Sequence, residues 1–130
     1  PAVRRTSSSG GAWPPGAGGF VYDFPVEQAA YARLGAGMPQ VAARFELVID
    51  GIEIANGWHE IADAASQRER HAHEAAARRA RGLPVGEPDP GLMAALACGL
   101  PDCAGIALGV DRLVLLACGA KDLAAVLAFG

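Results

Sequence analysis

Apolar and polar residues alternate within Phe45–Asp63, in the segment FELVIDGIEIANGWHEIAD, and this alternation predicts a β-hairpin. Asp50-Gly51 at its centre suits a two-residue turn, which places Glu46 opposite Ala55. Opposed residues share a face of the sheet, so the hairpin has one apolar face directed to the core. That face is formed by Phe45, Leu47, Ile49, Ile52 and Ile54.

The rest of the chain mixes strand-like and helix-like segments. An alanine-rich stretch ended by Gly82 and Pro84 predicts a helix, and Asp111 is available at the start of a last helix. Strands and helices that alternate without regular βαβ units predict an α+β fold, with an antiparallel sheet flanked by helices. The expected elements are strands at 20–25 and 104–110, a short helical piece within 26–47, and helices at 62–81, 89–101 and 111–120.

Residues 1–19 are rich in Gly, Pro and Ser, so we expect a disordered leader without regular elements before one domain over residues 20–130. The chain has 130 residues, 52% of them hydrophobic, and its net charge of −3 gives no general attraction to nucleic acid. No apolar run reaches the roughly 18 residues of a membrane span. Three cysteines without a CxxC pair favour reduced thiols and a cytoplasmic location.

Two carboxylates, Glu46 and Glu53, fall on the polar face of the predicted hairpin as diagonal neighbours, about 7 Å apart or less at Cβ. Their repulsion is relieved by solvent, by a proton, by Lys or Arg, or by a divalent cation. Oxygen-only ligands of this kind suit Mg²⁺, which binds one or two carboxylates together with substrate phosphates. The alternative is a solvated sheet face, because charged outer faces are common in antiparallel sheets.

Asn56 and Glu60 join this polar group if a β-bulge occurs at Asn56-Gly57, because a bulge turns the side chains that follow it to the other face. An amide beside a carboxylate is a good receptor for an ammonium group. Trp58 then forms the wall of such a pocket, or it belongs to the core.

A second segment, AGIALGVDRLVLL, predicts a strand that leads into a helix. Gly109 would allow a ligand to approach the backbone, and Arg112 could place its guanidinium on a phosphate or stack on a base. The segment contains neither the P-loop pattern GxxxxGK nor GxGxxG. The alternative is a strand–helix joint with a surface arginine.

Together the two segments resemble the core of class II aminoacyl-tRNA synthetases, in the lysine branch. RFELVIDGIEIANGWHE is similar to the lysine-branch signature that follows motif 2, and GIALGVDRLVLLACGA is similar to motif 3. More narrowly, residues 20–130 resemble the elongation factor P–(R)-β-lysine ligases, which are truncated paralogues of lysyl-tRNA synthetase. FVYDFPVEQAA, ANGWHE and GLPDCAGIALGVDR are similar to that family's fxYxFPxxQAxLA, ANGFHE and GxPDCxGxALGVDR.

This resemblance implies an ATP site. The residues that match Glu46 and Glu53 hold ATP through Mg²⁺, and the backbone at Glu53 and Ile54 touches the nucleotide. The residues that match Gly109 and Arg112 belong to motif 3 and also bind ATP, with Arg112 as the catalytic arginine.

The resemblance also implies an amino-acid site next to the ATP. The residues that match Asn56 and Glu60 face the substrate, with Glu60 placed for an ammonium group. Ala107 stands where lysyl-tRNA synthetases usually carry Gly, so it is expected to affect which lysine isomer binds. The implied substrate is a β-lysine-type amino acid, which is activated by ATP and transferred to a lysine of elongation factor P, with tRNA not expected as the acceptor.

Motif 1, which builds the homodimer interface of the family, and motif 2 have no counterpart in residues 1–130. We therefore expect residues 20–130 to be the C-terminal portion of such a catalytic domain, with an exposed sheet edge and exposed apolar surface. Two alternatives stay open: a C-terminal fragment of a lysyl-tRNA synthetase, and a synthetase-like module without catalysis.

Overall fold

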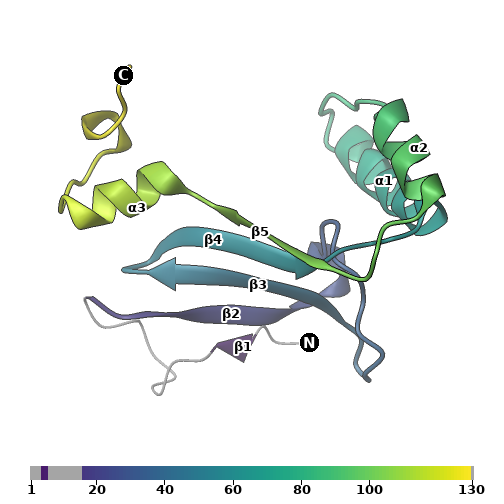
Figure 1. The fold of residues 1–130 in the computed structure, drawn as a ribbon, viewed down its shortest axis with the longest axis horizontal. Coiled ribbons are helices and arrows are strands. Elements are labelled where there is room, and N and C mark those ends of the chain that lie inside the picture. The colour runs from purple at the N-terminus through teal and green to yellow at the C-terminus, as the bar shows by residue number, and fades with distance from the viewer. Residues whose placement is uncertain (1–3, 6–15, 130) are drawn as a thin grey trace.

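A computed structural model describes residues 4–5 and 16–129, and an antiparallel sheet forms its centre (Figure 1). The five strands lie in chain order, β1-β2-β3-β4-β5, and every neighbouring pair is antiparallel. This confirms the predicted α+β fold with an antiparallel sheet. The strands are β1 (Arg4–Arg5), β2 (Gly18–Pro25), β3 (Val41–Ile49), β4 (Ile52–His59) and β5 (Ala104–Leu108).

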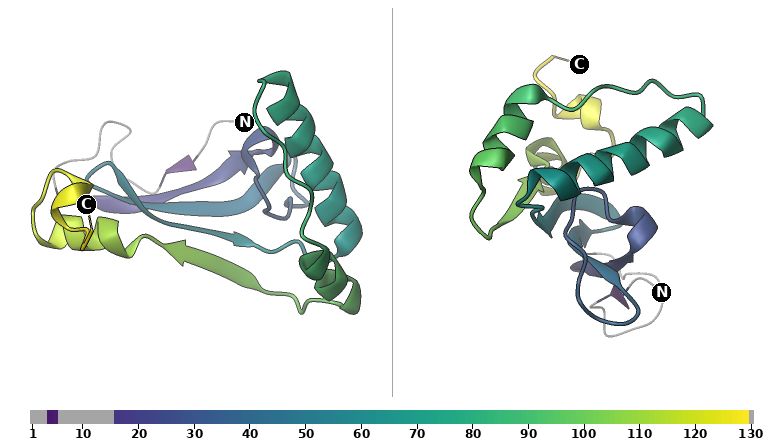
Figure 2. Two further views of the ribbon diagram at one scale, coloured as in Figure 1. Left: turned by 90° about the horizontal axis from the view of Figure 1, so that it is seen from above. Right: turned by 90° about the vertical axis from the view of Figure 1, so that its right-hand side faces the viewer.

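Helices lie at both ends of the sheet and leave its middle open (Figure 1). The long helix α1 runs across the strands at one end with α2 beside it, and α3 lies at the opposite end (Figure 2). Asp63 caps α1 by accepting a hydrogen bond from the backbone N of Ser66, and Asp89 caps α2 in the same way through Leu92. The helices are α1 (Ala64–Ala80), α2 (Pro90–Cys98) and α3 (Val110–Ala117), with 3₁₀ turns at Val26–Gln28 and Leu123–Ala125.

Two expectations about secondary structure are wrong in detail. Residues 1–19 were expected to form no regular element, yet Arg4–Arg5 pair with β2, and β2 itself begins at Gly18. A segment can pair with an open strand edge through its backbone alone and needs no apolar pattern to do so. The composition of residues 1–19 therefore did not reveal the pairing of Arg4–Arg5 with β2. The other residues of 1–15 lie outside the described part. The last helix starts at Val110 with Gly109 as its N-cap, and Asp111 lies in its first turn without capping it.

The hairpin of β3 and β4 contains a bulge, but not at the predicted position. Next to the turn, Val48 pairs with Glu53 as expected, and then Leu47 pairs with Ala55, which leaves Ile54 as the extra residue. Glu46 consequently lies opposite Asn56 and not opposite Ala55. One inserted residue anywhere between Glu53 and Asn56 has the same effect on the side chains that follow. The sequence could therefore predict the consequence of the bulge but not its position.

The buried core of the described residues is small, and much apolar surface is exposed. Its largest cluster consists of Phe24 with Ala29, Ala32 and Ala42, packed against Trp58 and a few aliphatic side chains. In the described part of the chain β5 pairs only with β4. On and beside this strand, Ile106 is 62% exposed and Val110 is 61% exposed. An open edge and apolar surface were expected.

No helix of the described residues has the length and apolar character needed to cross a membrane.

Candidate active site

The structure brings Glu46, Glu53 and Asn56 together on one face of the sheet. The side-chain amide of Asn56 lies between the two carboxylates, with Nδ2 3.5 Å from Oε1 of Glu46 and 3.4 Å from Oε1 of Glu53. The bulge at Ile54 produces this arrangement, because it turns Asn56 to the face that Glu46 occupies. The amide has two N–H donors, so it can donate to both anions.

Arg44 is a member of this group that sequence reasoning missed. Its NH2 lies 2.5 Å from Oε1 of Glu46, and its Nε donates to Oδ1 of Asn56 at 3.1 Å. The guanidinium also donates to the carbonyl of Gln28 at 2.8 Å and stacks 4.4 Å above the ring of Phe24. Arg44 and Glu46 are two residues apart in a strand and so share a face, and this was the available signal. Arginine is one of the counterions that the sequence allowed for, and here it pairs with Glu46.

The strand–helix joint reaches the same end of the hairpin. The backbone N of Gly109 donates to the carbonyl of Ile54 at 2.8 Å. From the first turn of α3, NH1 of Arg112 donates to the carbonyl of Glu53 at 2.7 Å and lies 3.7 Å from its Oε2. The stem of Arg112 lies against Gly109, where a Cβ atom would stand 3.3 Å from Cδ of the arginine. Two segments far apart in the sequence thus meet at the bulge.

Arg112 is 48% exposed and Glu53 is 41% exposed, so both side chains remain open to a ligand. A guanidinium carries five N–H donors, and the bond to the Glu53 carbonyl uses one of them. The remaining donors form a fork that matches phosphate oxygens. The group therefore contains two carboxylates and two guanidinium groups, with Arg44 beside Glu46 and Arg112 beside Glu53.

Glu60 lies on the same face just beyond the end of β4, outside the Asn56 group. Its Oε2 accepts a hydrogen bond from the indole Nε1 of Trp58 at 2.8 Å. Across the sheet, Ala107 of β5 pairs with Asn56, and Gly105 pairs with Trp58. Asn56, Trp58 and Ala107 therefore share the face of the sheet on which Glu60 lies.

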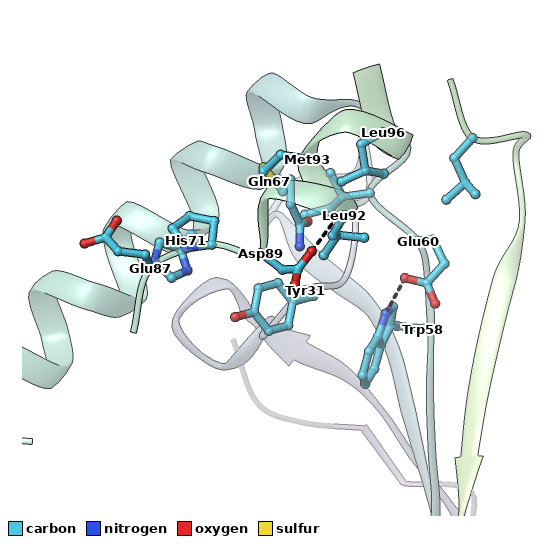
Figure 3. A pocket seen from close by; sticks show the side chains of 13 residues that line it. Tyr31, Trp58, Glu60, Gln67, His71, Glu87, Asp89, Leu92, Met93 and Leu96 are labelled. Atoms are coloured by element: carbon cyan, nitrogen blue, oxygen red, sulfur yellow. Dashed lines mark hydrogen bonds between the residues drawn. The ribbon is translucent and has the colours of Figure 1, made fainter. Parts of the chain in front are cut away.

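A pocket of about 460 Å³ opens between the end of β4 and the helices α1 and α2 (Figure 3). Trp58 and Glu60 form its wall on the sheet side, and Tyr31 forms part of another wall. Its remaining lining is mixed, with acidic and apolar side chains that include Glu87, Asp89, Leu92 and Leu96. A pocket of this kind suits a short aliphatic chain that ends in a cation.

On the opposite face, His59 points away from Glu60, as strand alternation predicts. Its Nε2 lies 2.7 Å from Oδ1 of Asp102, and NH1 of Arg33 lies 2.9 Å from the same oxygen. The hydrogen bond from His59, followed by the nearby charges of His59 and Arg33, holds the pKa of Asp102 below its usual value. This exposed cluster joins the segment before β5 to the segment after β2 and takes no part in the site.

The oxygen ligands at the hairpin fit a magnesium ion that arrives with a nucleotide, but they do not form a complete metal site. In the described residues no group of three or more His, Cys, Asp and Glu side chains could hold a metal. Mg²⁺ needs only one or two carboxylates when phosphates and waters supply the other ligands. Glu46 and Glu53 supply the two carboxylates, and a magnesium ion bound there would compete with Arg44 for Glu46 and with Arg112 for Glu53.

The chain is similar to known proteins over most of its length. The chain is 53% identical over 110 residues to proteins named "Elongation factor P--(R)-beta-lysine ligase" from Salmonella paratyphi B and Salmonella heidelberg. The matched region covers 85% of this chain and 34% of each relative, so the chain spans about a third of their length. Residues 17–130 match the profile described as tRNA synthetases class II (D, K and N). That match includes both segments of the site, and the chain belongs to the class II tRNA synthetase family that comprises the D, K and N enzymes.

Proposed function

We propose that this chain forms part of the catalytic domain of a cytoplasmic ligase that activates (R)-β-lysine with ATP and transfers it to a lysine of elongation factor P. The name of the Salmonella relatives supports this proposal. So do the segments ANGWHE and GLPDCAGIALGVDR, which resemble the ligases more closely than lysyl-tRNA synthetases.

One observation carries the nucleotide part of the proposal: Arg112 of α3 is bonded to the backbone of Glu53 at the bulge, beside the carboxylate pair. A triphosphate needs positive charge on its oxygens, and a guanidinium provides it bidentately. ATP is bound by Arg112, Gly109 and the backbone at Glu53 and Ile54. Glu46 and Glu53 hold its Mg²⁺, which neutralises phosphate charge when bound.

The amino acid lies on the face of the sheet that Asn56, Trp58 and Glu60 share. The carboxylate of Glu60 attracts the distal ammonium of a lysine-type substrate, and Asn56 binds the substrate through its amide. Ala107, directly opposite Asn56 on β5, limits the space beside the substrate. These three residues select the substrate and do not react with it.

The reaction needs no protein nucleophile. In the first step the substrate carboxylate attacks the α-phosphorus of ATP, so that an aminoacyl-adenylate forms and pyrophosphate leaves. In the second step the ε-amine of the acceptor lysine attacks the acyl carbon, loses a proton, and AMP leaves. The protein contributes mainly by positioning the reactants and by stabilising charge on the phosphates.

The experiment uses a chimera in which residues 17–130 replace the matching third of the Salmonella paratyphi B relative. We expect ATP–pyrophosphate exchange that depends on (R)-β-lysine and is weaker with α-lysine. Exchange that is the same with and without (R)-β-lysine contradicts the proposal. Exchange that prefers α-lysine favours the lysyl-tRNA synthetase alternative.

Ala107→Gly in this chimera is expected to raise activity with α-lysine relative to (R)-β-lysine. A glycine removes one methyl group beside Asn56, at the point where the two isomers differ in the position of the amino group. A single methyl in a binding pocket changes selectivity by about 1–3 kcal/mol. The measurement is the ratio of kcat/KM for the two isomers in pyrophosphate exchange, and an unchanged ratio would show that Ala107 does not set the selectivity.

A further inference from the structure

The carboxylate of Glu60 has a hydrogen-bond donor at one oxygen and the bare backbone of a glycine beside the other. Oε2 accepts the hydrogen bond from the Trp58 indole at 2.8 Å (Figure 3). Oε1 lies directly over the α-carbon of Gly105, so closely that a Cβ atom on that glycine would overlap it. Any side chain at position 105 therefore displaces the carboxylate.

Backbone contacts also hold Glu60 in place. Its N–H donates to the carbonyl of Cys103 at 3.0 Å, and Glu60 also forms an antiparallel bridge with Ala32. Trp58 and Gly105 are directly paired across β4 and β5, and Trp58 and Glu60 share a face because they are two residues apart. The strand register thus places the indole N–H of Trp58 and the backbone of Gly105, which has no side chain, beside the carboxylate of Glu60.

We propose that Trp58 and Gly105 are positioning residues that hold Glu60 in a single orientation as the receptor for the distal ammonium of the substrate, an inference that rests on the proposed function. An ionised carboxylate accepts at about four lone-pair positions, and the indole occupies one of them. The remaining lone-pair positions of the oriented carboxylate can accept the N–H donors of an ammonium group. The ligase segment ANGFHE has Phe where this chain has Trp58 in ANGWHE, and a phenyl ring has no N–H to donate.

A fixed carboxylate has a specific kinetic consequence. The ammonium group of the substrate meets a carboxylate that does not have to be reordered, so the interaction favours binding of the correct substrate. It has no effect on the reacting carboxylate at the other end of the substrate. Loss of the indole donor should raise KM for an amine substrate without lowering kcat. It should not affect a substrate of the same length that ends in a methyl group.

Trp58→Phe in the chimera is expected to raise KM for (R)-β-lysine about tenfold, the scale of a hydrogen bond to a charged group, with kcat and KM for ATP unchanged. KM for (R)-3-aminohexanoate, which lacks the ammonium, should stay the same. Gly105→Ala should have a larger effect in the same direction, because it displaces the carboxylate. Tyr22→Phe is the matched control, because it also removes a hydrogen-bond donor from an aromatic side chain. Tyr22 lies on the face of the sheet that Phe45 occupies, opposite to the face of Glu60.

A double-mutant cycle decides whether Trp58 acts through Glu60. In a Glu60→Gln background, Trp58→Phe should have almost no further effect on KM for (R)-β-lysine. Equal changes in KM for both substrates, or an undiminished effect in that background, would overturn the inference.

A spectroscopic measurement separates this inference from the proposed function. In the ¹⁵N-tryptophan-labelled chimera, the indole N–H resonance assigned through Trp58→Phe should lie downfield and move on Glu60→Gln. A resonance that does not respond to Glu60→Gln would contradict the positioning role even in an active chimera. Absence of exchange with (R)-β-lysine alongside a responsive resonance would contradict the proposed function and leave the Trp58–Glu60 contact in place.

Discussion

Arg112→Ala in the chimera is expected to lower the rate of ATP–pyrophosphate exchange by about a hundred- to a thousand-fold. That range is typical for the loss of one preorganised charge donor, and Arg112 would act on the pyrophosphate end of the triphosphate, which leaves in the first step. The guanidinium is preorganised because NH1 is bonded to the carbonyl of Glu53 at 2.7 Å and because its stem packs against Gly109. Arg112→Lys keeps the charge but loses the planar fork, so an intermediate rate is expected.

Arg78→Ala provides the control for this prediction. Arg78 also donates from its guanidinium to a backbone carbonyl, that of Pro84 at 2.7 Å, but it lies on α1 away from the carboxylate pair. Its replacement should leave exchange unchanged. Equal rate losses for the two alanine variants would show that Arg112 has a structural role and does not bind ATP.

The isolated 130-residue chain is expected to be at least a hundredfold slower in pyrophosphate exchange than the full-length Salmonella relative. Charge develops on the oxygens of the α-phosphate in the transition state, and the resemblance assigns that position to an arginine of motif 2. No segment of residues 1–130 resembles motif 2. Arg112, which matches motif 3 at the far end of the triphosphate, cannot neutralise both positions, and one missing charge donor costs about a hundred- to a thousand-fold.

This comparison uses the purified chain beside the full-length relative, with (R)-β-lysine and ATP at equal concentrations. Exchange by the isolated chain within about tenfold of the relative would contradict the view that its active site is incomplete. Size-exclusion chromatography of the same sample should show self-association, because Ile106 on β5 and Val110 at the start of α3 are exposed.

The hairpin shows how far local pattern determines the site. Alternation and the Asp50-Gly51 turn gave the correct pairing next to the turn, where Val48 lies opposite Glu53. The pattern also indicated that a bulge must exist if Asn56 is to join the carboxylates. It could not locate the bulge, because a one-residue insertion at any of several neighbouring positions has the same effect on side-chain direction.

The contacts that organise the site depend on tertiary geometry. Arg44 reaches Glu46 within one strand, and its position two residues away was a usable signal. Its bonds to the carbonyl of Gln28 and to Asn56 cross between elements, and no spacing in the sequence specifies them. The contact of Gly105 with Glu60 likewise follows from the register of β4 and β5, which is set by pairing and not by local composition.

Motif resemblance, in contrast, predicted which distant segments would meet. The GVDR segment was expected near the hairpin only because both resemble one synthetase core, and the structure places Arg112 at the bulge. The roles of these residues in binding ATP and amino acid stay predictions until they are measured.

The most direct test of the proposed ligase function is the transfer of radiolabelled (R)-β-lysine by the chimera of residues 17–130 with the Salmonella paratyphi B relative. Purified elongation factor P and lysine tRNA are supplied together as competing acceptors. We expect ATP-dependent label on elongation factor P, lost when its acceptor lysine is replaced by arginine, with no label on tRNA. Label on tRNA, or no label on either acceptor under conditions in which the unmodified relative labels elongation factor P, would contradict it.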